Sequence, residues 1–541
     1  MNEMEQSTGN PMIIPADKEK LTSHPTKNEI LNIIRNLANG KAAGKDGLRN
    51  EYLKYANEQT IDEMWQIMKR VWETNVIPEL WRETLQIPIP KKKKTKKTSD
   101  FRRITLCNLG YKIYATWLVG RLREYAGNPG YHQAAFVNNR STDDQMYYAR
   151  RYLEAYWNSG QTLIVGSLDI NKAFDNVKLE SIEHILQELN VPQHIINRVR
   201  QAINFERTSI LWEGIESNQT IKSRGIKQGC PMSPYIFTLI IQKILKQIKE
   251  KIGTLNILEL HDKGLPIILA YADDLLLITK NVDELEKIII LLKAELSKVG
   301  LELNTVKSKI LIREPNSDRN IPDIIEIDND KYEVIQTLRY LGTYFTETLD
   351  RPNTTRIRCR QALNTTRVVL EFMKKFKPSW YIAKLIYKTV ISPAITYGLK
   401  SAAWVKKNRT SVARYELQII RELLKLARDR PKGRIRVSKL LNGRTAVNRA
   451  RVMRLKYWAH IQRREQGHPL KSAERLEFTG KKRGRPAKTW NDTIREDKNK
   501  LMEISETEWH ELAKNKTEFK KKVEEIYNTI GSEEESSSEI E

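Results

Sequence analysis

The 541-residue chain has few cysteines and no long hydrophobic run. Its three cysteines, Cys107, Cys230 and Cys359, lie far apart, so they form no zinc-binding spacing and indicate a reducing compartment. No apolar segment approaches the roughly 18 residues of a membrane span, and the polar, acidic start MNEMEQSTGN is unlike a signal peptide. The sequence therefore predicts an intracellular protein with no membrane partner, located in the nucleus, the cytoplasm or both.

Negatively charged residues are fewer than positively charged ones. The chain has 67 Asp and Glu against 93 Lys and Arg, a formal net charge of +26. A polyanionic partner with salt-sensitive binding fits this balance, although a basic surface can also serve solubility alone. The length predicts more than one domain.

Two adjacent acids interrupt an otherwise apolar run. The segment LPIILAYADDLLLITKN (residues 265–281) has the pattern of a buried strand pair with Asp273 and Asp274 at its turn. Aspartate is common in turns, so a plain hairpin is the simple alternative. Carboxylates in an apolar setting are costly without a partner, and a divalent cation is a natural one.

A third acid lies upstream in a similar position. Residues 163–168 form an apolar, β-branched run that predicts a strand, and Asp169 ends it. Three carboxylates at neighbouring strand ends can hold two Mg²⁺ ions about 4 Å apart, a pair suited to in-line displacement at phosphorus. Between these acids, GIKQGCPMSPYIFTLIIQKIL (residues 225–245) predicts a tight glycine loop followed by an apolar helix. Gln228 and Gly229 in that loop could approach a base pair closely.

Other segments resemble one known family, in that family's order. They are KAAGKDGLRNEYLKY (41–55), DFRRITLCNLGYKIYATWLVGRL (100–122), HQAAFVNNRSTDDQ (132–145), GLELNTVKSKIL (300–311), RYLGTYF (339–345) and, near the end, RLKYWAHIQRR with GRPAKTWNDTIRED. These segments, taken together with Asp169, the glycine loop of 225–245 and the Asp273-Asp274 pair, resemble the reverse transcriptases of non-LTR (LINE-type) retrotransposons. The resemblance is to RTE-like elements in particular. The resemblance implies the α+β class, a right-hand polymerase with fingers, a palm with an antiparallel sheet, a helical thumb and a helical, basic C-terminal extension.

The resemblance also implies roles for individual residues. It implies an RNA-directed DNA polymerase, a nucleotidyltransferase, that takes an RNA template, a DNA primer and deoxynucleoside triphosphates. Phe174 would exclude a 2′-hydroxyl, although an aromatic residue at the start of a helix is also an ordinary core residue. The remaining implied sites are Asp169, Asp273 and Asp274 for two Mg²⁺ (or Mn²⁺) ions, Arg102, Gln228 and Gly229 at the incoming nucleotide, Lys307 as a general acid, and Tyr340, Leu341 and Gly342 at the primer end.

Departures from the family pattern keep alternatives open. Arg103 stands where the family has proline, and Ala135 and Asn139 replace glycines. One alternative is a domesticated or truncated element product that binds nucleic acid with little or no catalysis. Another is an RNA-directed RNA polymerase, against which Phe174 argues. Since only about 25 to 40 residues precede the motifs, we expect the family's endonuclease to come from another chain.

Five regions are expected along the chain. They are a disordered N-terminus (1–25), fingers and palm (26–345), a helical thumb (346–460), a basic extension (461–530) and an acidic disordered tail (531–541). Every catalytic match precedes residue 346, so the later regions are expected to bind nucleic acid rather than to take part in chemistry. The basic run at 91–97 is interpreted as an exposed fingers loop that is solvated, touches the template backbone or acts as a nuclear-import signal. The run at 480–486 is interpreted as a flexible linker, with contact to an A·T minor groove or RNA, or nuclear import, as alternatives. Tyr457, Trp458 and Trp490 are interpreted as core residues or as base-stacking rings.

Overall fold

The fold is that of a computed structural model covering the whole chain. The structure describes residues 22–91, 97–204, 206–253, 265–314, 321–347, 351–429, 431, 435–480, 486–533 and 539–540. The basic runs at 92–96 and 481–485, most of the acidic tail and residues 1–21 lie outside the described residues, so the predictions for them stay predictions. In the described part of the chain, no helix combines the length and apolar character needed to cross a bilayer.

The chain divides into two compact units, each made of several stretches of sequence. The first unit contains residues 1–139, 170–254 and 290–304, and the second contains 140–169, 255–289 and 305–541. The chain therefore passes from one unit to the other directly after Asp169. Helix α13 (Val282–Lys298) begins in the second unit and ends in the first.

The first unit combines a small sheet with helices. Strand β1 pairs with β2 antiparallel and with β4 parallel, and β4 also pairs with β5 and β6. Thr26 begins helix α2 through a reciprocal capping box with Glu29. The elements are α2 (Lys27–Arg35), α3 (Asn50–Lys54), α4 (Glu58–Thr74), α5 (Glu79–Arg82), β1 (Glu83–Pro90), η2 (Thr98–Asp100), β2 (Phe101–Leu106), α6 (Leu109–Ala126), α8 (Ala173–Asn176), α9 (Leu179–Glu188), α10 (Gln193–Ile203), β4 (Arg207–Trp212), β5 (Ile215–Glu216), β6 (Thr220–Ile221) and α11 (Ser233–Gly253).

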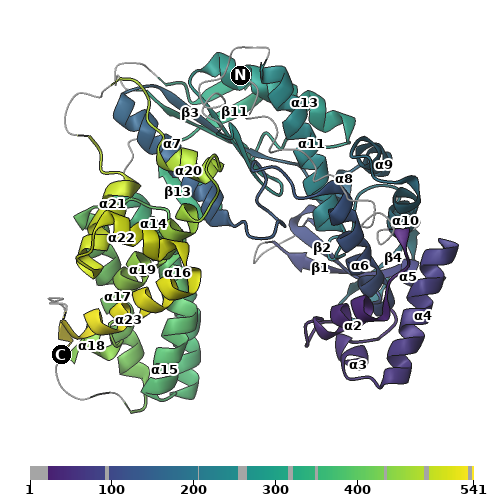
Figure 1. The fold of residues 1–541 in the computed structure, drawn as a ribbon, viewed down its shortest axis with the longest axis horizontal. Coiled ribbons are helices and arrows are strands. Elements are labelled where there is room, and N and C mark those ends of the chain that lie inside the picture. The colour runs from purple at the N-terminus through teal and green to yellow at the C-terminus, as the bar shows by residue number, and fades with distance from the viewer. Residues whose placement is uncertain are drawn as a thin grey trace. The chain divides into compact units, whose positions relative to one another are not determined.

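The second unit contains a six-stranded sheet in the order β10-β11-β9-β3-β8-β7 and a large group of helices (Figure 1). Helix α7 (Thr142–Ser159) precedes the strands of this unit. The strands are β3 (Leu163–Asp169), β7 (Ile268–Tyr271), β8 (Asp274–Thr279), β9 (Lys309–Arg313), β10 (Ile324–Ile327) and β11 (Asp330–Val334) in the sheet, and β12 (Thr337–Tyr340) and β13 (Thr343–Thr346) in a separate hairpin. Its later elements are α14 (Arg351–Phe376), α15 (Trp380–Ile386), the π-helical η3 (Tyr387–Ile391), α16 (Ser392–Thr396), α17 (Lys406–Leu426), β14 (Ile435–Arg436), α18 (Val437–Leu440), α19 (Ala446–Gln462), α20 (Pro469–Glu474), α21 (Trp490–Leu501), α22 (Glu506–Lys514), α23 (Lys516–Glu533) and β15 (Glu539–Ile540).

Strand β3 lies at the centre of this sheet. It pairs antiparallel with β8 on one side and β9 on the other. Among the described strands of this sheet, only β9 and β11 pair in parallel. Leu163, Ile164, Val165 and Leu168 are buried, which explains why this strand is apolar on both faces. The expected α+β class and the mainly antiparallel sheet are therefore confirmed.

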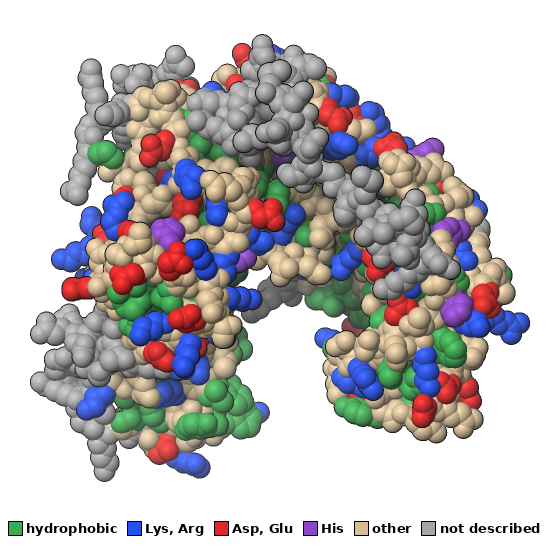
Figure 2. Space-filling model, in the orientation of Figure 1, with side chains coloured by type: hydrophobic (Ala, Val, Ile, Leu, Met, Phe, Trp, Pro, Cys, Tyr) green, Lys and Arg blue, Asp and Glu red, His purple; other side chains and the backbone are tan. Residues whose placement is uncertain are grey.

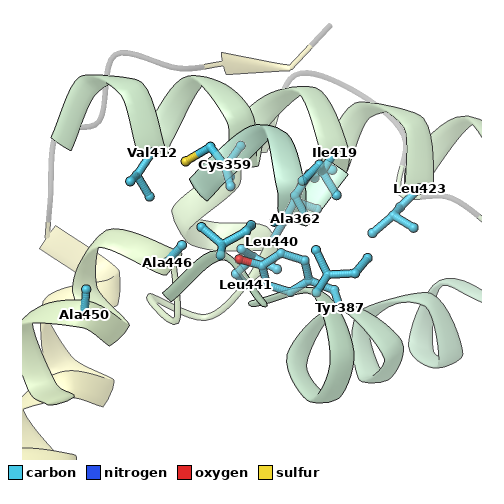
Figure 3. Close-up of a cluster of buried hydrophobic side chains, with 14 of the residues drawn as sticks. Cys359, Ala362, Tyr387, Val412, Ile419, Leu423, Leu440, Leu441, Ala446 and Ala450 are labelled. Carbon is cyan, nitrogen blue, oxygen red and sulfur yellow. The ribbon is translucent and has the colours of Figure 1, made fainter. Parts of the chain in front are cut away.

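Helices dominate after residue 346, as predicted. Helices α14, α17 and α19 pack around a buried apolar cluster that includes Cys359, Tyr387 and Ile419 (Figure 3). The side chains labelled in Figure 3 come from α14, η3, α17, α18, α19 and the loop between α18 and α19, and they point toward one another. Burial of their apolar area stabilises this group.

The C-terminal extension belongs to the same core. Trp490 is fully buried, its ring lies 4.9 Å from that of Tyr147 on α7, and its indole N–H donates to Lys400 O at 2.9 Å. Asp497 pairs with Arg451 at 3.2 Å and Arg454 at 2.7 Å, and all three side chains are at most 4% exposed. These contacts make residues 490–497 part of the packed unit rather than an appended tail.

Candidate active site

Two strands of the central sheet bring two acids opposite each other. In the β3–β8 register, Asp169 is the direct partner of Asp274. Strands β7 and β8 meet in a tight hairpin in which Ala272 has φ 57°, and Asp273 occupies the next position of this turn. The hairpin and the acid pair predicted from the sequence are thus present together.

The acids influence one another electrostatically. Loss of hydration, followed by the negative charges of Asp273 and Asp169, raises the pKa of Asp274 to about 6. Lys307 and Arg339 oppose this rise but do not cancel it. The side chain of Asp274 stays accessible to solvent. A carboxyl with this pKa marks an excess of negative charge that a cation would relieve.

Lys307 lies beside the first acid. Its Nζ donates to Asp169 Oδ2 at 2.9 Å, and the Asp169 backbone N–H donates to Ser308 Oγ at 3.2 Å. The lysine side chain is 64% exposed, so its ammonium can reach a solvent-borne phosphate. The structure therefore places Lys307 beside Asp169, and its role as a general acid stays a prediction.

The metal-binding prediction needs a qualification from the geometry. Among the described residues, no three His, Cys, Asp or Glu side chains are arranged close enough to enclose one metal ion. Asp169 instead directs a carboxylate oxygen to Lys307. The donor set of carboxylate oxygens fits a hard divalent cation, and the raised pKa of Asp274 fits it as well. Cation binding at Asp169 Oδ2 would require that oxygen to exchange its lysine partner.

The predicted primer-end residues form the turn of the β12–β13 hairpin. Leu341 has φ 45° and Gly342 has φ 74°, the pattern of a two-residue turn that suits twisted strands. Tyr397 donates its hydroxyl to Leu341 O at 2.9 Å. Tyr340 is only 2% exposed and donates to Leu269 O at 3.4 Å, so its side chain anchors the hairpin to β7 and does not face solvent.

In the first unit, the backbone of the glycine loop around Gln228 and Gly229 is hydrogen-bonded to β2. Thr105 N donates to Gln228 O at 2.6 Å. Gly229 has φ 124°, and a Cβ there would lie 2.3 Å from Thr105 O. Only glycine fits this close approach, which explains the Gln-Gly pair.

Phe174 lies beside the same loop. Its carbonyl accepts from Ile226 N at 2.7 Å, and its half-buried ring stacks on Phe237 with centroids 5.0 Å apart. Phe136 approaches the ring edge-on at 6.4 Å and is 46% exposed. Phe136 is therefore a further candidate site residue, which the sequence did not single out. The signal that could have identified it is its place as the aromatic residue of the segment 132–145.

Two departures from the family pattern now have physical explanations. Arg103 forms an ion pair with Asp175 at 3.0 Å, so the residue in the proline position links β2 to the start of α8. Asn139 has φ 61°, the left-handed conformation that glycine favours and that asparagine tolerates better than most residues. Arg102, the predicted triphosphate contact, is exposed on β2.

The predicted residues fall into two groups. Asp169, Asp273, Asp274, Lys307 and the 340–342 turn belong to the second unit, whereas Arg102, Phe174, Gln228 and Gly229 belong to the first. The possible base-stacking role of Tyr457, Trp458 and Trp490 receives no support, because all three are buried among core residues.

Sequence comparisons place residues 89–345 within the profile described as reverse transcriptase (RNA-dependent DNA polymerase). The chain is 28% identical over 283 residues to the Pol polyprotein of the type-1 retrotransposable element R2 of Popillia japonica, covering 50% of this chain and 38% of that protein. It is 27% identical over 334 residues to the type-2 element R2DM polyprotein of Drosophila melanogaster, covering 59% and 29%. It is 24% identical over 399 residues to the RNA-directed DNA polymerase from the mobile element jockey of Drosophila melanogaster, covering 69% and 41%.

The matched part of this chain thus spans less than half the length of each of these relatives. Among solved structures, apo telomerase from Candida tropicalis, truncated from its C-terminal domain, is similar at a TM-score of 0.35 and 14% identity, over 53% of this chain and 59% of that chain.

Proposed function

We propose that this chain, which belongs through residues 89–345 to the reverse transcriptases of the non-LTR retrotransposon type, extends a DNA primer on an RNA template. The observation that supports this most is the pairing of Asp169 with Asp274 at the ends of the adjacent strands β3 and β8, with Asp273 in the adjoining turn. Three acids at neighbouring strand ends beside an exposed lysine suit transfer of a nucleotidyl group.

Asp169, Asp273 and Asp274 are proposed to hold two Mg²⁺ ions, with Mn²⁺ as a substitute, which would supply activation of the 3′-hydroxyl and charge neutralisation at the phosphates. The chain's own groups contribute the rest. Lys307 can donate a proton or a hydrogen bond to the leaving pyrophosphate, because its ammonium is exposed beside Asp169.

The first unit is proposed to select the nucleotide. The exposed guanidinium of Arg102 suits triphosphate oxygens. The Phe174 ring, fixed by Phe237, would close the space that a 2′-hydroxyl needs. The backbone of Gln228 and Gly229 would lie against the new base pair.

The primer end is proposed to rest on the β12–β13 turn. Since the Tyr340 ring is buried, contact with the primer would come from the backbone of Leu341 and Gly342. Tyr397 and Tyr340 would then act by holding the turn in place.

Primer extension with purified protein tests this function. The reaction contains a DNA primer annealed to an RNA template, deoxynucleoside triphosphates and Mg²⁺, with a DNA template in a parallel reaction. We expect extension on the RNA template. Binding of the template–primer without extension would instead identify a nucleic-acid-binding protein. Extension only when ribonucleotides replace the deoxynucleotides would identify an RNA polymerase.

A further inference from the structure

An ion pair joins strand β2 to the short helix that carries Phe174. Arg103 Nη2 lies 3.0 Å from Asp175 Oδ2, and both residues belong to the first unit. Such pairs are ordinary on this molecule, since Figure 2 shows lysine and arginine side chains beside acidic ones across the visible face. Most exposed pairs contribute little to stability. This pair differs in its position, because Asp175 directly follows Phe174, the residue proposed to exclude a 2′-hydroxyl.

The helix that carries Phe174 is too short to keep its shape alone. Helix α8 contains four residues, Ala173–Asn176, and it begins after Lys172, whose φ is 44°. A single helical turn is marginal without outside contacts, because few hydrogen bonds offset the cost of fixing its backbone. The position of the Phe174 ring therefore depends on what packs against α8.

The glycine loop and helix α11 both contact α8. In the loop, Ile226 N donates to Phe174 O at 2.7 Å. A Cβ at Gly225 would lie 2.5 Å from Asp175 O, so the two backbones approach closely. Helix α11 contributes Phe237, whose ring stacks on that of Phe174. These contacts engage the backbone and the ring of α8, whereas its carboxylate pairs with β2.

We infer that the Arg103–Asp175 pair holds the Phe174 ring in place and so sets how strongly a ribonucleotide is rejected. The inference rests on the proposed function and adds two positioning residues that act through Phe174 rather than by touching the substrate. Exclusion of a hydroxyl group is sensitive to displacement, since a shift of about 1 Å can change a rate by about a hundredfold. Without the pair, α8 gains freedom at Asp175, and the neighbouring ring yields to a 2′-hydroxyl.

Direct contact of Arg103 with the triphosphate is the competing explanation, because its side chain is 48% exposed. The two explanations predict different results for Asp175. If the pair positions Phe174, Arg103→Gln and Asp175→Asn break the same contact, so their effects should be similar and should not add in the double variant. If Arg103 binds phosphate, only its own substitution should weaken nucleotide binding, and by the same factor for both sugars.

The test measures equilibrium binding of the next templated nucleotide to the protein on an RNA template with a dideoxy-terminated DNA primer. No transfer occurs on such a primer, so discrimination is measured apart from chemistry. Deoxy- and ribonucleoside triphosphates are titrated in Mg²⁺, and the ratio of their dissociation constants is the readout. The matched control, Arg200→Gln/Glu183→Gln, removes an ion pair of similar exposure between α9 and α10 of the same unit. Melting curves confirm that each variant folds.

Arg103→Gln and Asp175→Asn should each reduce discrimination against the ribonucleotide about threefold or more, a change within the range that one exposed ion pair contributes. Ribonucleotide binding should change more than deoxynucleotide binding. The charge-reversed pair Arg103→Asp/Asp175→Arg should recover most of the discrimination, and the control should leave it unchanged. Hydrogen exchange at the Ile226 amide, which donates to Phe174 O, should be faster in both single variants.

Three results would overturn the inference. They are unchanged discrimination in both single variants, an equal loss in the control, and a loss confined to Arg103→Gln, which would assign that residue to the triphosphate. The proposed function fails in a different way. If the wild-type protein binds the template–primer but no nucleotide, the polymerase function is refuted and the inference falls with it, whereas nucleotide binding with unchanged discrimination refutes the inference alone.

Discussion

Phe174 is the residue whose surroundings most directly suggest substrate choice. Its ring is stacked on Phe237 and flanked by Phe136, so it cannot move aside without losing aromatic contacts. Phe174→Val should raise ribonucleotide insertion relative to deoxynucleotide insertion, because the smaller side chain leaves space for a 2′-hydroxyl. Single-nucleotide insertion kinetics with both substrates measure this ratio, and an unchanged ratio would show that another residue forms the gate.

Gly229 gives a second prediction at the scale of one residue. Gly229→Ala should destabilise the first unit and slow nucleotide insertion, because the added Cβ would overlap Thr105 O. Gly120→Ala is the matched control, since that helical glycine has nothing within 4 Å of an added Cβ and alanine favours a helix by roughly 0.5–1 kcal/mol. Denaturant unfolding and insertion rates check both variants. Equal tolerance at the two positions would mean that the loop has room to shift.

At the scale of the element, Glu416 controls how helix α17 supports η3 and α19. Burial raises the pKa of its carboxyl to about 7, above the ordinary value of 4.5, despite hydrogen bonds from Tyr387 and Ala446. The folded state thus binds the proton more tightly than the unfolded state. The resulting contribution to stability is complete below about pH 4.5 and is lost as the pH rises through about 7.

Glu416→Gln should remove this pH dependence, because an amide keeps a hydrogen-bonding oxygen without a charge. The measurement is the free energy of unfolding from pH 5 to pH 8, in parallel with Glu371→Gln, which changes an exposed acid on α14. A wild-type slope that persists in Glu416→Gln would assign the titration to a different group.

The sequence was sufficient for elements whose signal is local. The Asp-Asp hairpin, the strand ending at Asp169 and the Thr26 helix start follow from short patterns, and the structure contains all three. The Arg103–Asp175 pair joins residues 72 positions apart, and no local pattern encodes such a contact. Tyr340 was assigned to the primer end from its motif, but its burial depends on β7, about 70 residues earlier.

At the scale of the whole molecule, the C-terminal extension is a structural part of the second unit. The sequence suggested a basic segment that only adds binding, because its aromatic and charged residues have no visible partners nearby. Trp490 instead packs on Tyr147, and Asp497 neutralises two buried arginines, Arg451 and Arg454. Deleting residues 470–541 should therefore unfold the second unit rather than only weaken nucleic-acid binding.

Asp497→Ala tests this integration with a single change. It leaves two buried guanidinium groups without their carboxylate, which costs roughly 3–5 kcal/mol. Asp492→Ala on the same helix is the control. Asp492 is half-buried and closes the capping box with Thr489, so this change shows the effect of losing a capping acid alone, about 1 kcal/mol. Thermal and denaturant unfolding measure both. A loss below about 1 kcal/mol for Asp497→Ala would contradict the role of the extension in the core.

The central claim is that the acids at the β3 and β7–β8 strand ends perform nucleotidyl transfer. The decisive measurement is the rate of single-deoxynucleotide addition to a DNA primer on an RNA template, with template–primer affinity measured alongside. Asp273→Asn should slow addition at least about a hundredfold with affinity nearly unchanged, because it removes a negatively charged ligand of the proposed metal ions, whose positive charge would stabilise the transition state by several kcal/mol. Asp283→Asn, an exposed acid at the start of α13, should leave both unchanged. Addition at the wild-type rate by Asp273→Asn would contradict the account.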